Sequence, residues 1–376
     1  MMFALAAAQV SSSTPWPTKG WPSSTPAAEG MAAAPLEAFD RDLAAGKYGN
    51  VDAMLVIRHG RVVFEKTYDH SADYMRRFAG KGAPGIYNYY DPGWHPYYKG
   101  TKLHTMQSVS KSVTSALVGI AIGEGKIPGV DAKAMPYFAD FKVPPDPRRD
   151  RMTLADILTM RTGIRWDEES TEYTDPRNNC AVMEGSEDWV RYVLEQPMAA
   201  DPGTAFVYNS GATELLSYLI WKTTGKQADD YAKERLFTPL GIEYFWKRTP
   251  KGLADTEGGL YLTPRDLAKI GDLYLHDGVW DGKRLLPEGW AAASTKPRTK
   301  TNEKGYEYGY QWWVMPKGEG LSHAGYNAWG YGGQLLLVVP ELDLIAVFTG
   351  WNIYDTPSLD PRLALGRVLS AVSQKP

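Results

Sequence analysis

The sequence is short of cysteine, of net charge and of long apolar runs. One thiol, Cys180, cannot form an internal disulfide, and it argues against a metal cluster held by thiolates. A formal charge of −3 over 376 residues gives no field that would attract nucleic acid. No stretch approaches the ~20 consecutive apolar residues of a membrane span. The length then allows one large domain or two closely packed ones.

Metal-binding patterns are also missing from the sequence. The six histidines show no His-Glu-x-x-His motif and no paired spacing, so we expect neither a metal nor another cofactor. Of the six, only His323 is retained as a candidate for a substrate cleft. Partners are expected to be small molecules, with no nucleic acid and no membrane, and the chain is expected to be a monomer or a homodimer.

The first 34 residues lack a regular apolar period and predict an extended arm, rich in Ser, Pro, Thr and Ala. Its first nine residues resemble the end of a secretory signal, with small residues at an Ala-x-Ala cleavage site. The basic start and the full apolar stretch of such a signal are missing. We expect a bacterial protein that is periplasmic or secreted, with the cytoplasm as the alternative.

The remaining chain predicts strands at both ends and helices between them. A hairpin is expected where two apolar runs flank His59-Gly60. A long irregular loop is expected over 68–103, and the strongest helical pattern runs over 108–123. The other expected helices are 36–45, 154–161, 187–196, 212–223, 229–236, 267–275 and 362–372, and the expected strands are 53–58, 61–66, 310–315, 333–339 and 344–349.

This order predicts one sheet built from both ends of the chain, with a helical block inserted as a second lobe. We place the α/β part at 35–107 and 256–376 and the mainly helical part at 108–255. A cleft between two such lobes is a natural place for chemistry.

The segment Ser108-Val109-Ser110-Lys111 stands at the start of the strongest predicted helix. Positions i and i+3 share a helix face, so Lys111 could reach the Ser108 hydroxyl. A serine is a poor nucleophile until a neighbouring base takes its proton, and a lysine can be that base if its surroundings lower its pKa. The alternative interpretation is an N-capping serine followed by a surface lysine.

The wider stretch Met106-Gln107-Ser108-Val109-Ser110-Lys111 resembles the nucleophile helix of serine β-lactamases and penicillin-binding proteins, whose pattern is Ser-x-x-Lys. Downstream, Met152 to Gly163 resembles that family's helix leading into a Thr-Gly turn. The resemblance implies an α+β fold, an α/β sandwich in which helices flank an antiparallel sheet and an all-helical lobe is inserted.

The second matching motif is Tyr208-Asn209-Ser210, which resembles the family's Tyr-x-Asn or Tyr-x-Ser. The resemblance implies that Tyr208 relays a proton to the leaving group and that Ser210 hydrogen-bonds to substrate or to Lys111. A buried tyrosine beside a helix N-cap is the alternative. Trp166 is a further candidate for lining the acyl pocket, with core packing as its alternative role.

The third motif departs from the family, because no Lys-Thr-Gly or Lys-Ser-Gly occurs downstream. One candidate is His323-Ala324-Gly325, which resembles a motif of some esterase relatives. We prefer the run from Gly330 through Tyr331 to Gln334, which resembles the corresponding strand of 6-aminohexanoate-dimer hydrolases and related esterases. On that alignment the backbone N–H groups of Ser108 and Tyr331 form the oxyanion hole. A simple hairpin turn is the alternative.

The resemblance implies two-step acyl transfer to water through an acyl-enzyme on Ser108, with Lys111 and Tyr208 as general base and acid. In relatives that process β-lactams, the third-motif Lys or His helps to hold the substrate carboxylate. Its absence favours a carboxylesterase or an amidase of the 6-aminohexanoate-oligomer type. The alternatives are a β-lactamase or DD-peptidase, a non-catalytic binding protein of the same fold, and an acyltransferase.

Overall fold

The computed structural model describes residues 16–68, 76, 91–173, 175–353 and 358–372. The expected signal remnant and most of the expected loop over 68–103 therefore lie outside the described residues.

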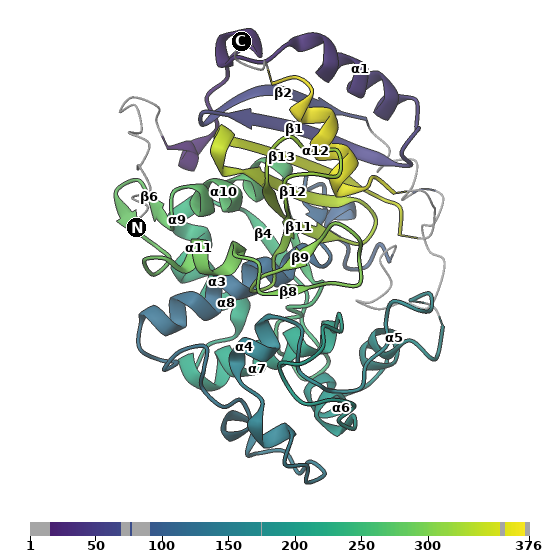
Figure 1. Ribbon diagram of the computed structural model, residues 1–376, viewed down its shortest axis with the longest axis vertical. Coiled ribbons are helices and arrows are strands. Elements are labelled where there is room, and N and C mark those ends of the chain that lie inside the picture. Colours follow the sequence, from purple (N-terminus) through teal and green to yellow (C-terminus); the bar gives the residue numbers. More distant parts are fainter. Residues whose placement is uncertain (1–15, 69–75, 77–90, 174, 354–357, 373–376) are drawn as a thin grey trace.

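An eight-stranded antiparallel sheet forms the centre of the α/β part (Figure 1). Its strand order is β2-β1-β13-β12-β11-β10-β9-β8, so the strands from the two ends of the chain meet where β1 pairs with β13. The strands are β1 (Val51–Arg58), β2 (Arg61–Thr67), β8 (Thr299–Lys300), β9 (Glu307–Tyr308), β10 (Trp313–Met315), β11 (Gly325–Gly330), β12 (Gln334–Val339) and β13 (Leu344–Gly350).

Helices cover both faces of this sheet. Helices α1 (Ala33–Ala44) and α12 (Pro361–Leu369) pack against each other and against strands β1 and β12. On the other face, α10 (Pro264–Leu275) packs against β12 and β13, and α3 (Val109–Gly123) packs against β11. The expected antiparallel sheet flanked by helices is confirmed.

A group of helices lies beyond α3, at the lower end of Figure 1. Helix α7 packs against α3, α4 and α6, so α3 contacts both the sheet and these helices. The members are α4 (Leu154–Leu158), α5 (Asn179–Glu184), α6 (Trp189–Glu195) and α7 (Ser210–Thr224). Helix α8 (Ala228–Ala232) packs against α3 and α7, and a π-helical turn Lys233–Phe237 leads from it to α9 (Thr238–Leu240), which lies beside α10 in Figure 1. The proposed boundaries of the two parts stay a prediction.

Small elements complete the described chain. A three-stranded sheet contains β3 (His104–Thr105), β5 (Leu260–Leu262) and β4 (Tyr244–Trp246), and a hairpin contains β6 (Val279–Trp280) and β7 (Lys283–Arg284). The remaining helices are α11 (Trp290–Thr295) and the 3-10 turns Pro17–Lys19, Ala27–Glu29, Pro96–Lys99, Met135–Phe138, Arg149–Arg151 and Pro340–Leu342.

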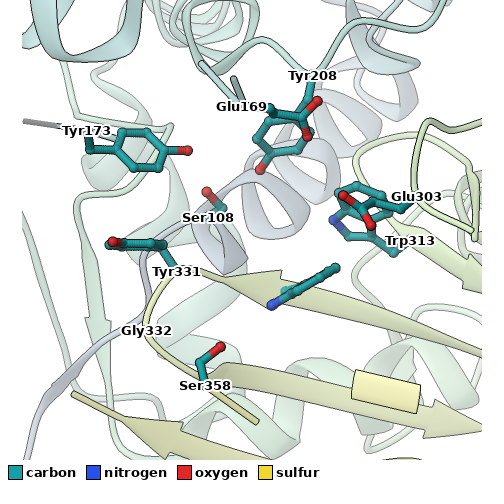
Figure 2. Close-up of a pocket in the computed structure, with 10 residues that line it drawn as sticks. Ser108, Glu169, Tyr173, Tyr208, Glu303, Trp313, Tyr331, Gly332 and Ser358 are labelled. Carbon is teal, nitrogen blue, oxygen red and sulfur yellow. The ribbon is translucent and has the colours of Figure 1, made fainter. Parts of the chain in front are cut away.

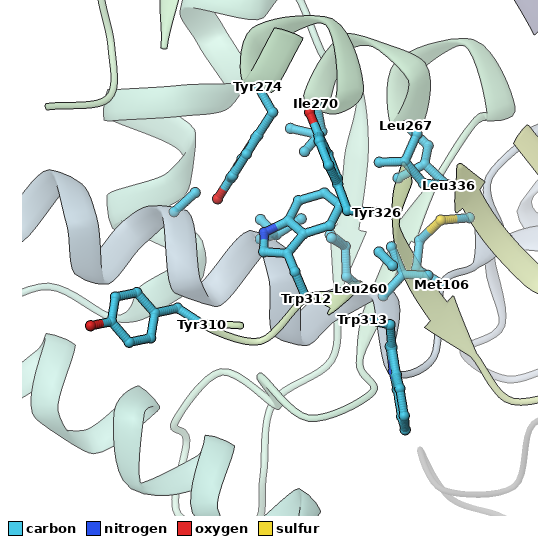
Figure 3. Close-up of a cluster of buried hydrophobic side chains, with 14 of the residues drawn as sticks. Met106, Leu260, Leu267, Ile270, Tyr274, Tyr310, Trp312, Trp313, Tyr326 and Leu336 are labelled. Carbon is cyan, nitrogen blue, oxygen red and sulfur yellow. The ribbon is translucent and has the colours of Figure 1, made fainter. Parts of the chain in front are cut away.

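The core that supports the nucleophile helix lies between α10, α3 and the sheet (Figure 3). The ring of Trp312 is fully buried, with the rings of Tyr274 and Tyr326 at centroid distances of 4.6 and 5.3 Å. Met106, two residues before Ser108, is fully buried in the same core. The position of the nucleophile is therefore fixed by packing on its N-terminal side.

The expected extended arm differs in its described part, residues 16–34. Two 3-10 turns occur there, and helix α1 already begins at Ala33. The ring of Trp21 is buried, and the N–H of Ser24 donates to the carbonyl of Val62 at 2.9 Å. The N–H of Val62 in turn donates to the carbonyl of Pro22 at 2.8 Å, so this segment lies along strand β2.

Candidate active site

Ser108 caps the N-terminus of α3, as expected for a nucleophile at a helix start. The N–H of Met106 donates to the carbonyl of Leu260 at 2.8 Å, which ties the approach segment to β5. The next residue, Gln107, has φ of 48°, a left-handed conformation that is uncommon for a residue with a side chain. The sharp turn at Gln107 leads directly from β3 into α3.

Lys111 lies one turn along α3 and is almost completely buried. Its Nζ donates to Oγ of Ser108 at 2.9 Å and to the backbone carbonyl of Glu257 at 2.7 Å. Oε2 of Glu257 lies 3.4 Å from the same nitrogen. The ammonium therefore has an acceptor for each of its three protons.

These acceptors decide the protonation state of Lys111. Burial alone lowers the pKa of Lys111, but the negative charges of Glu257 and Glu168 raise it, and the net direction is upward. The lowered pKa that the sequence argument requires for a lysine base is therefore absent. Lys111 is an ammonium at rest, so it accepts a proton only if it gives one away.

Tyr208 also contacts the nucleophile, and its hydroxyl hydrogen-bonds to the side chain of Ser108; both residues line the cavity in Figure 2. The Tyr208 ring stacks on Trp313 at 5.6 Å between centroids, and Nζ of Lys111 lies 5.3 Å from its centroid. Burial raises the pKa of Tyr208 well above its usual value, with Glu168 adding to the effect. The structure brings Ser108, Lys111 and Tyr208 together, as the motif spacing predicts.

Glu168 is a buried carboxylate that the sequence analysis did not single out. It accepts hydrogen bonds from the N–H of Ser210 at 2.8 Å, from the hydroxyl of Ser210 at 2.7 Å and from Nε1 of Trp166 at 2.5 Å. Burial raises the pKa of Glu168, and the nearby Lys111 acts against that rise. We expected Ser210 to hydrogen-bond to substrate or to Lys111. In the structure it hydrogen-bonds to Glu168, and Trp166 donates to the same carboxylate.

The residues after Gly330 form the turn between β11 and β12 beside the nucleophile. A methyl group at Gly330 would lie 2.3 Å from the carbonyl oxygen of Met106, so only glycine permits this approach. Nε2 of Gln334 donates to the carbonyls of Tyr331 at 3.3 Å and Gly350 at 2.5 Å. Tyr331 therefore lies on a braced turn next to Ser108, and its oxyanion role stays a prediction.

His323 does not reach this region. It precedes β11, whose other end carries Gly330, and six strand residues span roughly 17 Å. Its Nδ1 bonds to the hydroxyl of Ser322 at 2.9 Å, and its Nε2 lies 4.0 Å from Glu341. His323 thus lies near the opposite end of β11 from Gly330 and is not among the residues that line the cavity at Ser108, and its role in a cleft stays a prediction.

A cavity of about 170 Å³ opens directly above Ser108 (Figure 2). Aromatic rings dominate its wall, and two carboxylates, Glu169 and Glu303, are the ionisable acids in it. Burial raises the pKa of Glu169 to about 7, and the charges of Glu168 and Glu303 contribute. The wall consists of Ser108, Glu169, Tyr173, Tyr208, Glu303, Trp313, Trp329, Tyr331, Gly332 and Ser358.

A group of metal-type ligands, Cys180, Glu184 and Glu257, lies behind Lys111, with ligand atoms within 4.8 Å of one another. Glu184 hydrogen-bonds to Glu257, and burial raises the pKa of Glu184 well above its usual value, so this carboxyl keeps its proton. Burial also raises the pKa of the Cys180 thiol. The Lys111 ammonium already lies 3.4 Å from Oε2 of Glu257 and supplies the positive charge beside this group, and we assign no metal here.

The family model described as Beta-lactamase matches residues 50–350, most of the chain. A curated relative, the 6-aminohexanoate-dimer hydrolase of Paenarthrobacter ureafaciens, is 26% identical over 300 residues, which are 73% of this chain and 72% of the relative. Among the described residues, no helix has the length and apolar character to cross a bilayer.

Solved structures share the fold at low sequence identity. EstCE1, described as a hydrolase with promiscuous acyltransferase activity, superposes with a TM-score of 0.66 at 14% identity, covering 92% of this chain and all of that one. A penicillin-binding protein homologue from Pyrococcus abyssi gives 0.63 at 18% identity, covering 86% of this chain and 75% of that one. At these identities the superpositions establish the fold alone.

Proposed function

Because this chain belongs to the β-lactamase family of hydrolases, we propose that it cleaves carboxylic esters or amides through an acyl-enzyme on Ser108. The observation that carries the proposal is the bonding of one hydroxyl to two proton carriers. Oγ of Ser108 accepts from Nζ of Lys111 at 2.9 Å and bonds to the hydroxyl of Tyr208. This arrangement faces a cavity large enough for a small acyl group.

The chemistry follows from these contacts. Ser108 attacks the carbonyl carbon, and its proton moves into the Lys111 site as the new C–O bond forms. The negative charge on the carbonyl oxygen develops near the N-terminus of α3, where free N–H groups favour an anion. Tyr208 then protonates the leaving group, and water releases the acyl group in a second cycle.

The cavity wall favours neutral or cationic substrates over carboxylates. Glu169 and Glu303 line it, and no lysine, arginine or histidine occurs among the described lining residues. A β-lactam or a D-Ala-D-Ala peptide brings a carboxylate into a site that already holds two acids. The proposal therefore places esters and plain amides ahead of β-lactams.

The test is hydrolysis of p-nitrophenyl acetate and butyrate by the wild-type protein and by Ser108→Ala. We expect the variant to lose at least about 1,000-fold in kcat, because the covalent route is lost. Circular dichroism should show an unchanged fold, since Ser108 is only half-buried.

Unchanged esterase activity in Ser108→Ala would remove Ser108 from the mechanism. A wild-type protein that hydrolyses neither these esters nor short anilides would contradict the hydrolase assignment. Nitrocefin, a chromogenic β-lactam with a carboxylate, provides the comparison for substrate class, and a faster reaction with it than with the esters would favour the β-lactamase alternative.

A further inference from the structure

Lys111 poses a proton-balance problem that Ser108 and Tyr208 do not solve. Surrounding carboxylates keep Lys111 protonated, and burial keeps the Tyr208 phenol protonated. Neither group is therefore present in the basic form that could take the serine proton at neutral pH. Another base must take a proton before Ser108 can attack.

Among the described residues, one carboxylate lies within reach of Nζ of Lys111. Oε2 of Glu257 is 3.4 Å from that nitrogen, and the Glu257 side chain is largely buried. Glu168 also raises the pKa of Lys111, but its oxygens are occupied by Ser210 and Trp166. Glu257 is thus the carboxylate placed to exchange a proton with Lys111.

Resting on the proposed role of Ser108, we propose that Glu257 is the terminal proton acceptor behind Lys111. As Ser108 attacks, its Oγ–H bond breaks and an Nζ–H bond forms, while another Nζ–H bond breaks and a proton binds Oε2 of Glu257. Lys111 remains an ammonium throughout, Glu257 becomes neutral, and the negative charge moves to the carbonyl oxygen near the N-terminus of α3. The proton then returns through Lys111 to Tyr208, after Tyr208 has protonated the leaving group.

The loop that carries Glu257 is held rigidly. Oε1 of Glu214, on α7, accepts from the N–H groups of Thr256 at 2.5 Å and Glu257 at 3.2 Å. The hydroxyl of Thr256 donates to the carbonyl of Thr213 at 3.0 Å. The same loop presents both the carbonyl and the carboxylate of Glu257 to Lys111, so α7 positions two of the three acceptors of the ammonium.

Several titratable groups surround Glu257. The protonated Glu184 hydrogen-bonds to it from α5, and Lys111 approaches it from α3. Glu257 therefore has a hydrogen-bonding carboxyl group on one side and the Lys111 ammonium on the other. The other groups that interact electrostatically with this cluster are Glu168, Tyr173, Cys180, Tyr208, Glu214, Lys247 and Asp255.

The experiment compares kcat for p-nitrophenyl butyrate against pH in the wild type and in Glu257→Gln. The amide keeps the shape but takes no proton, so we expect about a 100-fold loss near pH 7. The remaining rate should rise about tenfold per pH unit, because the reaction then needs Lys111 to lose its proton to water. The control is Asp272→Asn, a buried carboxylate on α10 outside the site, which should keep the wild-type rate and profile.

A wild-type rate in Glu257→Gln would overturn the inference, and so would a loss by the same factor at every pH, which indicates a structural role alone. If that variant does not fold, Glu257→Asp withdraws the carboxylate by about 1.5 Å and keeps its charge. We expect at least a tenfold slower reaction with the wild-type pH profile, and full activity would overturn the inference.

A second readout does not depend on turnover. Titration of the Lys111 ¹⁵Nζ resonance should show a lower pKa in Glu257→Gln than in the wild type, because the nearest negative charge has gone. An unchanged pKa would overturn the role of Glu257 and leave the Ser108 mechanism standing. An inactive wild type with a shifted Lys111 pKa would instead refute the proposed function.

Discussion

Tyr208 shows how burial restricts the chemistry of one residue. Its pKa is raised well above the usual value because the ring and hydroxyl are buried among Trp313, Ser108 and Glu168. Such a phenol is a weak acid. It therefore assists only leaving groups that must gain a proton before they depart. Tyr208 should therefore matter for amides and much less for esters of acidic alcohols.

We expect Tyr208→Phe to reduce kcat/KM for an anilide by about 100-fold or more and for p-nitrophenyl butyrate by less than about tenfold. The nitrophenolate leaves without a proton, whereas an amine does not. Both substrates are measured on the same variant, so a change in folding would lower the two rates together. Equal losses would contradict the role of Tyr208 as the acid.

At the scale of elements, the turn between β11 and β12 brings the sheet to the nucleophile. Gly330→Ala would push a methyl group to 2.3 Å from the Met106 carbonyl oxygen, and β11 and the approach to α3 would have to separate. We expect a stability loss of about 1–3 kcal/mol and a fall in kcat larger than the fall in substrate binding. Urea unfolding and steady-state kinetics measure the two effects.

The matched control is Gly185→Ala, at the end of α5, where an added methyl meets its nearest atoms at 3.5 Å and φ is −76°. It should leave stability and rate nearly unchanged. A Gly330→Ala protein that is as active and as stable as this control would mean that β11 and the nucleophile segment are not tightly packed.

Helices and strands were predictable from the sequence where their apolar residues followed a single helical or strand period. The hairpin at His59-Gly60, helices α3 and α10 and strands β12 and β13 lie close to their expected ranges. Strand β11 was not predicted, because Gly325, Asn327 and Gly330 break any apolar run in it. Its position between β10 and β12 comes from pairing with distant strands, which a local pattern does not encode.

At the scale of the whole molecule, the candidate site combines residues that the sequence could and could not reveal. Lys111 was predictable because it stands three positions after Ser108 on one helix, and Tyr208 because its motif resembles a family pattern. Glu168 and Glu257 had no such signal, because each is one acid among many and its role depends on the packing of separate segments around Lys111. Burial, which shifts their protonation, appears only in the fold.

The charge of the cavity is also a property of the whole molecule, because Glu169 follows α4 and Glu303 lies between β8 and β9. Both acids face the space above Ser108 (Figure 2). Burial, Glu168 and Glu303 raise the pKa of Glu169 to about 7. Glu169 is thus charged above that pH and loses its charge as the pH falls below it.

We therefore expect p-nitrophenyl 6-aminohexanoate to react with a higher kcat/KM than the mono-p-nitrophenyl ester of a dicarboxylic acid of similar length. The ratio should be largest above pH 7 and should fall as the pH drops through 7, because protonation of Glu169 removes its attraction for the ammonium. Glu169→Gln and Glu303→Gln should each reduce the ratio up to about fivefold, as for a partly exposed ion pair, and Glu169→Gln should also flatten its pH dependence. The neutral hexanoate ester is the control and should respond little to either change. A ratio near one that neither variant changes would mean that the substrate chain leaves the cavity on a side away from Glu169 and Glu303.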